Sequence, residues 1–223
     1  MENLFAKNSL RYGSLTVDCM LRARADFNHL TKTIQTVNNS GTDPAENLAF
    51  EESLLAKGRE IFMLWRNSPS VIAGRFVNID EAVDTEFAAL HKIPIVRRKS
   101  GGGAVYHDLG NVNYTFIMKD SRDLTLEYFS RRMIRALEAV GVNAVLEFRH
   151  NDILADGLKI SGAAQYHREG FMLHHGTLLF DADISVIPKI LKHPGRVVNI
   201  RPLLKDDMTI QEFMRRIYDY VQR

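Results

Sequence analysis

Residues 97–111 read RRKSGGGAVYHDLGN, and this stretch constrains the fold and the chemistry more than any other. Three consecutive glycines follow the cationic side chains of Arg97, Arg98 and Lys99. Glycines let a backbone approach a ligand and turn its amides toward an anion, and the cations add the charge that a phosphate requires. The stretch predicts either a nucleotide-phosphate loop or a basic strand ending in a plain glycine turn. It matches neither the P-loop nor the Gly-x-Gly-x-x-Gly dinucleotide pattern.

The strands predicted around this stretch gather in clusters instead of alternating with helices, which favours an α+β fold. Period-two and short apolar runs predict strands at residues 30–37, 61–65, 70–73, 93–98, 104–106, 112–117, 144–148, 152–155, 158–163 and 176–180. Helical periodicity predicts helices at residues 44–57, 81–91, 126–140, 185–191 and 209–221.

Two of these predictions are specific enough to be tested residue by residue. The strands at residues 104–106 and 112–117 are expected to be joined by a hairpin-like turn, because glycine and asparagine punctuate the link. The helix at residues 81–91 is expected to turn Val83, Phe87 and Leu90 inward.

Length and composition limit the classes of protein to which this chain can belong. The chain has 223 residues with 45% hydrophobic and 25% charged content, which suits one large domain at residues 29–223 after an N-terminal extension at residues 1–28. A net charge of +2 gives no case for nucleic-acid or membrane-surface binding, and no apolar run is long enough for a membrane span. The single cysteine, Cys19, excludes an intramolecular disulfide and fits a reducing cytoplasm.

A second group of candidate residues surrounds Lys159. Lys159 lies between Leu158 and Ile160 in an apolar strand, where an unpaired ammonium charge is costly. A phosphate or an acyl-adenylate carbonyl would be a suitable partner. The alternative is a surface lysine on an edge strand.

A third group is the pair His174 and His175, which interrupts an apolar strand. Adjacent strand residues point to opposite faces, and no metal-binding spacing accompanies them, so we predict no protein-bound catalytic metal and a pocket-lining role for one of the two. Cys19 lies far from every motif, and no Gly-x-Ser-x-Gly elbow is present, so neither offers a nucleophile.

Taken in order, these motifs resemble the lipoate-protein ligase family, within the biotin/lipoate ligase fold group. The resemblance runs from about Asp43 to the C-terminus and rests on DPAENLAFEE (residues 43–52), LWRN (64–67), VIAGR (71–75), residues 97–111, ND (151–152), KISG (159–162) and HHGTLL (174–179). It implies a mixed, largely antiparallel sheet flanked by helices. It also implies a reaction in which lipoate and ATP form lipoyl-AMP, whose acyl group then passes to a carrier lysine.

The resemblance also implies roles for individual residues. Lys159 would contact the carboxyl and phosphate oxygens of the adenylate as an electrostatic catalyst. Asn151 and Asp152 would lie near the adenylate and a Mg²⁺ ion held chiefly by ATP. Arg75 and His175 would line the site, and Trp65 would flank the dithiolane chain. The nucleotide would be held by Arg98, Ser100, Gly101, Gly102, Gly103, Ala104, Val105, Tyr106 and His107.

Partners follow from the same resemblance. The acceptor would be a lipoyl carrier domain of the 2-oxoacid dehydrogenase E2 or glycine-cleavage H type. The family's C-terminal accessory domain has no counterpart before Arg223, so we expect either that a separate accessory protein assists adenylate formation or that the chain only transfers an acyl group already activated.

Three rival functions stay open on the sequence. One is a lipoyl or octanoyl transferase that moves a pre-activated group without ATP, although such an enzyme is expected to use an active-site cysteine. Another is a non-catalytic binder of lipoyl domains, and the third is a biotin ligase, whose glycine-rich loop has a different composition.

Overall fold

The computed structural model describes residues 34–148, 150 and 152–222. The expected extension at residues 1–28, Cys19 and Asn151 lie outside this part. No helix within it is both long and apolar enough to cross a membrane.

The elements, in chain order, are β1 (Gln35–Asn38), α2 (Pro44–Ala56), β2 (Ile61–Trp65), β3 (Ser70–Ala73), α3 (Ile79–Ala82), α4 (Thr85–Leu90), β4 (Ile95–Arg97), β5 (Ala104–His107), β6 (Asn111–Lys119), α5 (Leu126–Ala139), β7 (Val145–Glu147), β8 (Asp152–Ala155), β9 (Leu158–Ser161), β10 (Ala163–Arg168), β11 (Phe171–Leu179), α6 (Ile187–Ile190), η2 (Arg201–Leu203) and α7 (Ile210–Val221).

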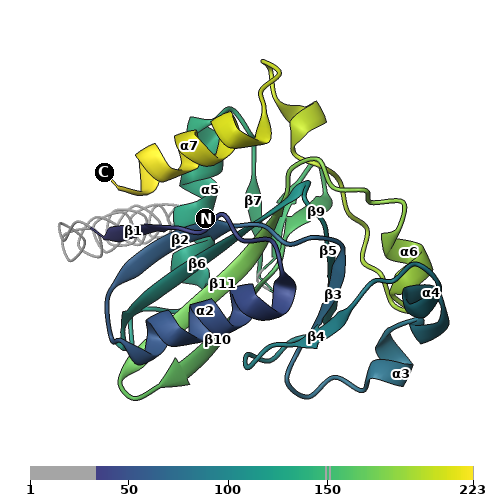
Figure 1. The fold of residues 1–223 in the computed structure, drawn as a ribbon. Helices are drawn as coiled ribbons and strands as arrows, with labels where there is room; N and C mark the ends of the chain where they lie inside the picture. Colours follow the sequence, from purple (N-terminus) through teal and green to yellow (C-terminus); the bar gives the residue numbers. More distant parts are fainter. Residues whose placement is uncertain (1–33, 149, 151, 223) are drawn as a thin grey trace, which may run out of the picture. The chain divides into compact units, whose positions relative to one another are not determined.

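The largest sheet has the strand order β1-β2-β6-β11-β10 (Figure 1). β1 runs parallel to β2, whereas the other three pairings in this sheet are antiparallel. The predicted α+β fold with a mixed, largely antiparallel sheet is therefore confirmed.

Helices cover both faces of this sheet, and β6 shows how its residues divide between them. The Thr115 hydroxyl donates to Glu51 of α2, whereas the ring of Phe116 packs 5.1 Å from Phe129 of α5. Because both faces are covered, β2 has no solvent-facing side, and all five of its residues are buried. This explains why the sequence here reads as continuous apolar runs.

Two smaller sheets, β4-β3-β5 and β7-β8-β9, complete the architecture. The predicted hairpin between residues 104–106 and 112–117 is wrong, because β5 pairs with β3 while β6 pairs with β2 and β11. The connecting segment packs against a distant part of the chain instead. The Gly110 carbonyl accepts from the Asp181 amide, and Asp108 accepts from the amides of Gly110 and Asp183. This contact fixes the segment that connects β5 in one sheet to β6 in another.

The predicted helix at residues 81–91 is two short helices, α3 and α4. Val83 has an extended backbone between them and bridges to Leu191, and the Asp84 carboxylate then caps α4 by accepting from the Phe87 amide. Val83 is buried as predicted and Phe87 packs against the same apolar cluster, but Leu90 is 78% exposed, so its inward placement is wrong. The buried residue of α4 is Ala88, and Leu90, two residues further on, lies on the opposite side of the helix.

The two adjacent histidines of β11 point to opposite faces, as predicted. His174 is fully buried on the α5 side and stacks on Phe129 with ring centroids 4.5 Å apart. Burial holds the pKa of His174 well below its usual value. His175 faces α2, where its Nδ1 lies 2.9 Å from an oxygen of Glu51.

The N-cap of α2 provides a stability test. The Asp43 carboxylate accepts from the amides of Ala45 and Glu46, both at 2.9 Å. We expect Asp43→Ala to lower the free energy of unfolding by about 1 kcal/mol, because two amides lose their acceptor. Urea unfolding measures this, and Asp43→Asn, which keeps a cap oxygen, should stay near the wild type. An equal loss in both variants would argue against the cap.

His174 predicts acid sensitivity. Its folded-state pKa lies below that of the unfolded chain, so the unfolded state binds the extra proton and stability falls as the pH drops below about 6.5. The loss should approach about 1.4 kcal/mol per pH unit for this group. We expect His174→Phe to flatten the decline in the free energy of unfolding between pH 7 and pH 5, whereas His193→Gln at an exposed histidine should not. Identical slopes in all three proteins would exclude His174 as the cause.

Candidate functional site

A cavity of about 340 Å³ lies where the three sheets meet. Its apolar wall includes Leu48, Trp65, Ile72 and Val105, which belong to a single hydrophobic cluster under α2. Its polar wall includes the Lys159–Asp152 ion pair and two residues of the glycine loop at residues 101–103, Gly102 and Gly103. The cavity is therefore amphipathic, with a buried apolar side and a charged side.

Arg98 holds the glycine loop in place. Its Nη2 donates to the carbonyls of Gly101 and Gly103 at 2.7 and 2.9 Å, and its Nη1 donates to the carbonyl of Ile72. Burial lowers the pKa of Arg98 to about 10, which leaves the guanidinium charged at neutral pH. Most of its N–H groups are thus committed to protein carbonyls, and the loop's shape depends on it.

Two glycines make this loop possible. Gly102 has φ = +87°, a left-handed conformation that side chains disfavour. Gly74 lies directly beneath, and a Cβ there would be 2.0 Å from the Gly102 carbonyl oxygen. Gly101, by contrast, has open space around the position of a Cβ. The close approach of two backbones therefore fixes the loop from below.

The Lys159 ammonium lies on the cavity wall, 2.8 Å from Asp152 Oδ1. Its side chain is 32% exposed, and Gly162 leaves room for it, since a Cβ at Gly162 would be 2.8 Å from Nζ. The backbone of Lys159 is fixed by hydrogen bonds with Arg196 and Val198. The predicted strand at residues 158–163 divides at this glycine into β9 and β10.

His175 joins the cavity to the buried Glu51. Its Nδ1 faces the Glu51 carboxylate, and its Nε2 lies 2.7 Å from Ser100 Oγ. The same carboxylate accepts from Thr115, whose hydroxyl accepts from Trp65 Nε1 at 2.9 Å. These groups form a continuous hydrogen-bonded chain behind the cavity wall.

His107 contributes a donor to the cavity. Its Nδ1 accepts from the Asn67 amide at 3.1 Å, because the oxygen of that amide already accepts from Asn47. Burial, with smaller contributions from Arg98 and His175, lowers the pKa of His107 to about 3. The neutral ring therefore carries its proton on Nε2, a buried atom for which the described residues supply no hydrogen-bond partner.

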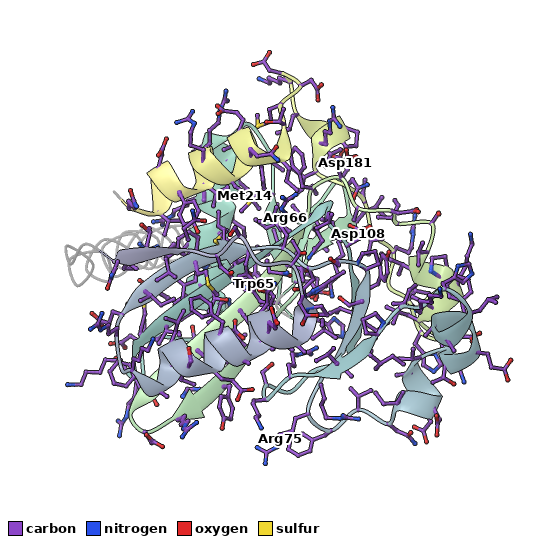
Figure 2. The ribbon with its side chains drawn as sticks, in the orientation of Figure 1. Trp65, Arg66, Arg75, Asp108, Asp181 and Met214 are labelled. Carbon is purple, nitrogen blue, oxygen red and sulfur yellow. The ribbon has the colours of Figure 1, made fainter. Side chains whose placement is uncertain are left out.

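The structure brings most of the predicted site residues to this cavity. Those on its wall are Trp65, Arg98, Gly102, Gly103, Val105, His107, Asp152, Lys159 and His175. Ser100, Gly101 and Ala104 belong to the supporting loop and strand. The Tyr106 side chain packs into the apolar cluster on the far side of β5, and Arg75 is exposed beside Phe76, at the lower margin of Figure 2.

Some site residues escaped the sequence analysis. Leu48, Asn113 and Thr177 line the cavity, and Glu51 lies behind it. Only Glu51 carried a usable signal, since this acid shares the apolar stripe of α2 with Leu48 and Leu55. Within the described residues, no three His, Cys, Asp or Glu side chains gather closely enough to hold a metal ion.

Comparison with known proteins places these features in a family. Residues 43–222 match the family described as "Lipoyl protein ligase A/B catalytic domain". The chain is 39% identical to lipoate-protein ligase LplJ of Bacillus subtilis over 82% of its length, and 38% identical to lipoate–protein ligase 1 of Staphylococcus aureus over 81%. It spans 61% and 60% of those two relatives. It is also 38% identical, over 72% of its length, to the mitochondrial lipoyl amidotransferase LIPT1 of Mus musculus, of which it spans 44%.

Solved structures agree with this match. Protein Ta0514 from T. acidophilum with bound lipoic acid aligns with a TM-score of 0.75 at 27% identity, covering 85% of this chain and 84% of that one. Lipoate-protein ligase A bound with ATP aligns with a TM-score of 0.74 at 27% identity, with the same coverage. A bi-partite lipoate protein ligase from Thermoplasma acidophilum, described with its E2 lipoyl domain, aligns at 0.72 and 26% identity, covering 84% and 82%.

The contact between Gly74 and the glycine loop generates a prediction. A methyl group at position 74 meets backbone atoms, which cannot move aside as a flexible side chain would. We expect Gly74→Ala to lower the free energy of unfolding by about 1–3 kcal/mol and to displace the backbone amide signals of residues 101–103 in NMR spectra. Gly101→Ala, which meets open space, serves as the matched control. Unshifted loop signals in Gly74→Ala would show that the loop does not depend on this contact.

Proposed function

Because the chain belongs to the lipoyl protein ligase A/B catalytic-domain family, we propose that it activates lipoate with ATP to lipoyl-AMP and transfers the lipoyl group to a lysine of a lipoyl carrier domain. Both 38–39% identical bacterial relatives carry the name lipoate-protein ligase. Lipoate and ATP as substrates are supported by the related structures that hold lipoic acid and ATP.

The amphipathic cavity is the observation that carries this proposal. Lipoate is an apolar chain with a carboxylate at one end, and the cavity joins the apolar wall at Leu48, Trp65 and Ile72 to a charged wall at Lys159. Burial of the chain would supply most of the affinity, while the charged wall would orient the carboxylate. Trp65 and His175 are accordingly proposed as flanks of the acyl chain.

Lys159 is the proposed catalytic residue. In the first step a lipoate carboxylate oxygen attacks the α-phosphorus of ATP and pyrophosphate leaves; in the second, the carrier amine attacks the acyl carbon and AMP leaves. The ammonium on the cavity wall would stabilise the negative charge that develops on the oxygens in both steps. Its partner Asp152 would hold it in position, with Asn151 nearby in sequence.

The glycine loop is the proposed phosphate site. Arg98 acts on this proposal mainly by shaping the loop, since its N–H groups are occupied by loop carbonyls, while Gly102 and Gly103 present their backbone to the cavity. Mg²⁺ would enter with ATP and be held chiefly by its phosphates, for which Asp152 offers the nearest carboxylate on the wall.

The carrier and the cellular setting also belong to the proposal. An E2-type lipoyl domain is the proposed acceptor, supported by the related bi-partite ligase described with such a domain, and that relative also supports a separate accessory protein. A single cysteine suits a reducing cytoplasm. The alternative, transfer of a pre-activated group without ATP, is favoured only by the likeness to the amidotransferase LIPT1.

Lys159 is tested by substitution. We expect Lys159→Ala to reduce acyl transfer at least about a hundredfold, because the developing charge loses its cationic partner. Mass spectrometry of an apo lipoyl domain measures the transfer, and a thermal melt reports on the fold. Lys189→Ala, at an exposed lysine, is the control. Full activity of Lys159→Ala with a normal melt would remove Lys159 from the site.

The function itself is tested with three acyl donors. The purified chain is incubated with an apo lipoyl domain and with lipoate plus ATP, synthetic lipoyl-AMP or an octanoylated carrier. Modification with ATP would establish a self-sufficient ligase, and modification with the adenylate alone would indicate a need for an accessory protein. Transfer from an octanoylated carrier without ATP would instead support the transferase.

A further inference from the structure

The buried hydrogen-bonded chain behind the cavity has a defined direction. Trp65 Nε1 and Arg98 Nε can only donate, and the carboxylate oxygens of Glu51 are the acceptors at the other end of the chain. Thr115 therefore accepts from Trp65 and donates to Glu51 at 2.6 Å. Two arms of the chain, one from Trp65 and one from Arg98, both end at this carboxylate.

The second arm passes through Ser100 and His175. Ser100 Oγ accepts from Arg98 Nε at 3.0 Å, so its own proton is free to point to His175 Nε2 at 2.7 Å. His175 then carries its proton on Nδ1 and donates to Glu51 at 2.9 Å. This assignment gives a donor and an acceptor to each link of the arm.

The chain connects the two walls of the cavity. Trp65 belongs to the apolar wall, and Arg98 holds the carbonyls of Gly101 and Gly103 in the loop. Glu51, whose side chain is 3% exposed, lies between them and outside the wall itself. A shift of the indole can therefore reach the loop through Thr115, Glu51 and His175, whereas a shift of the His175 ring acts on Ser100 and Arg98 directly.

On the basis of the proposed function, we propose that Glu51 is a positioning residue that couples occupancy of the acyl-chain end of the cavity to the conformation of the phosphate loop. An acyl chain packed between Trp65 and His175 fixes the donor to Thr115 and one donor to Glu51. His175 in turn fixes Ser100 and, through it, Arg98. A nucleotide that binds afterwards meets a loop whose ordering is already complete, so the two ligands bind with positive cooperativity.

The same geometry could be read as a hydrolase triad, with Ser100 as the nucleophile, His175 as the base and Glu51 as the orienting acid. Two observations oppose this reading. Ser100 is 2% exposed, and its oxygen already accepts a hydrogen bond from Arg98. A nucleophile needs access to its substrate, so these three residues act on the loop.

The first test needs no ligand. Glu51→Gln replaces one acceptor oxygen by an NH₂ donor facing His175. This should move the ring proton from Nδ1 to Nε2 and reverse the direction of the hydrogen bond between His175 and Ser100. Long-range ¹H–¹⁵N spectra should show the altered tautomer, and the amide signals of Gly101, Gly102 and Gly103 should shift. Glu52→Gln makes the same chemical change on the next residue of α2 and should leave both unchanged. An unaltered loop in Glu51→Gln would overturn the proposal.

The second test measures the coupling. Calorimetry gives the Kd of an ATP analogue with a methylene bridge between the α and β phosphorus atoms, with and without lipoate. We expect lipoate to tighten nucleotide binding at least about fivefold in the wild type and in Glu52→Gln, and the ratio to fall toward one in Glu51→Gln. Thr115→Val, which cuts only the Trp65 arm and keeps the branched shape, should behave likewise and replaces Glu51→Gln if that variant does not fold.

The outcomes separate this proposal from the proposed function. A wild type that binds neither lipoate nor the analogue would overturn both. A wild type that binds both ligands, with a coupling ratio that persists in Glu51→Gln and Thr115→Val, would overturn only the role of Glu51. Labelling of Ser100 by a fluorophosphonate probe would support the nucleophile reading and overturn the positioning role.

Discussion

A charged guanidinium buried in a protein must find acceptors for its N–H groups, and the site in this protein is built around that requirement at Arg98. Three of its acceptors are backbone carbonyls, and two of those belong to the glycine loop. A buried guanidinium N–H without an acceptor would lower the free energy of unfolding by roughly several kcal/mol. The loop therefore cannot move away from the guanidinium without a large energetic penalty. The fold thus holds the loop close to one geometry, and only its final ordering is left to the ligands.

The two central cations of the site, Arg98 and Lys159, have different roles. Arg98 presents a rigid, planar set of donors, which suits the simultaneous binding of several carbonyls within the fold. Lys159 places a compact charge on a flexible stem at the cavity wall, tethered to one carboxylate. A flexible ammonium can follow charge from one reacting oxygen to another, as the proposed two-step acyl transfer would require.

The sequence predicted the parts of the site that local chemistry determines. A glycine triplet after three cations and a lysine in an apolar strand both carry signals within a few residues, and the structure brings Gly102, Gly103 and Lys159 to one cavity. Glu51 was missed because its importance comes from a contact with His175, 124 residues away. Asn113 and Thr177 were missed because strands from distant parts of the chain form the cavity that they line. The hairpin prediction failed similarly, since local turn residues did not reveal the contact between Gly110 and Asp181.

The separation of β5 from β6 has a consequence for how the cavity can change. Strands paired in one sheet are held about 4.8 Å apart by their hydrogen bonds, and substitution cannot alter that spacing. β5 and β6 belong to different sheets, so side-chain packing sets the gap between them. Substitutions can widen or narrow this gap by one methylene group at a time. A binding site between two sheets can therefore be adjusted to an acyl chain of a different length by small mutational steps while every sheet stays intact.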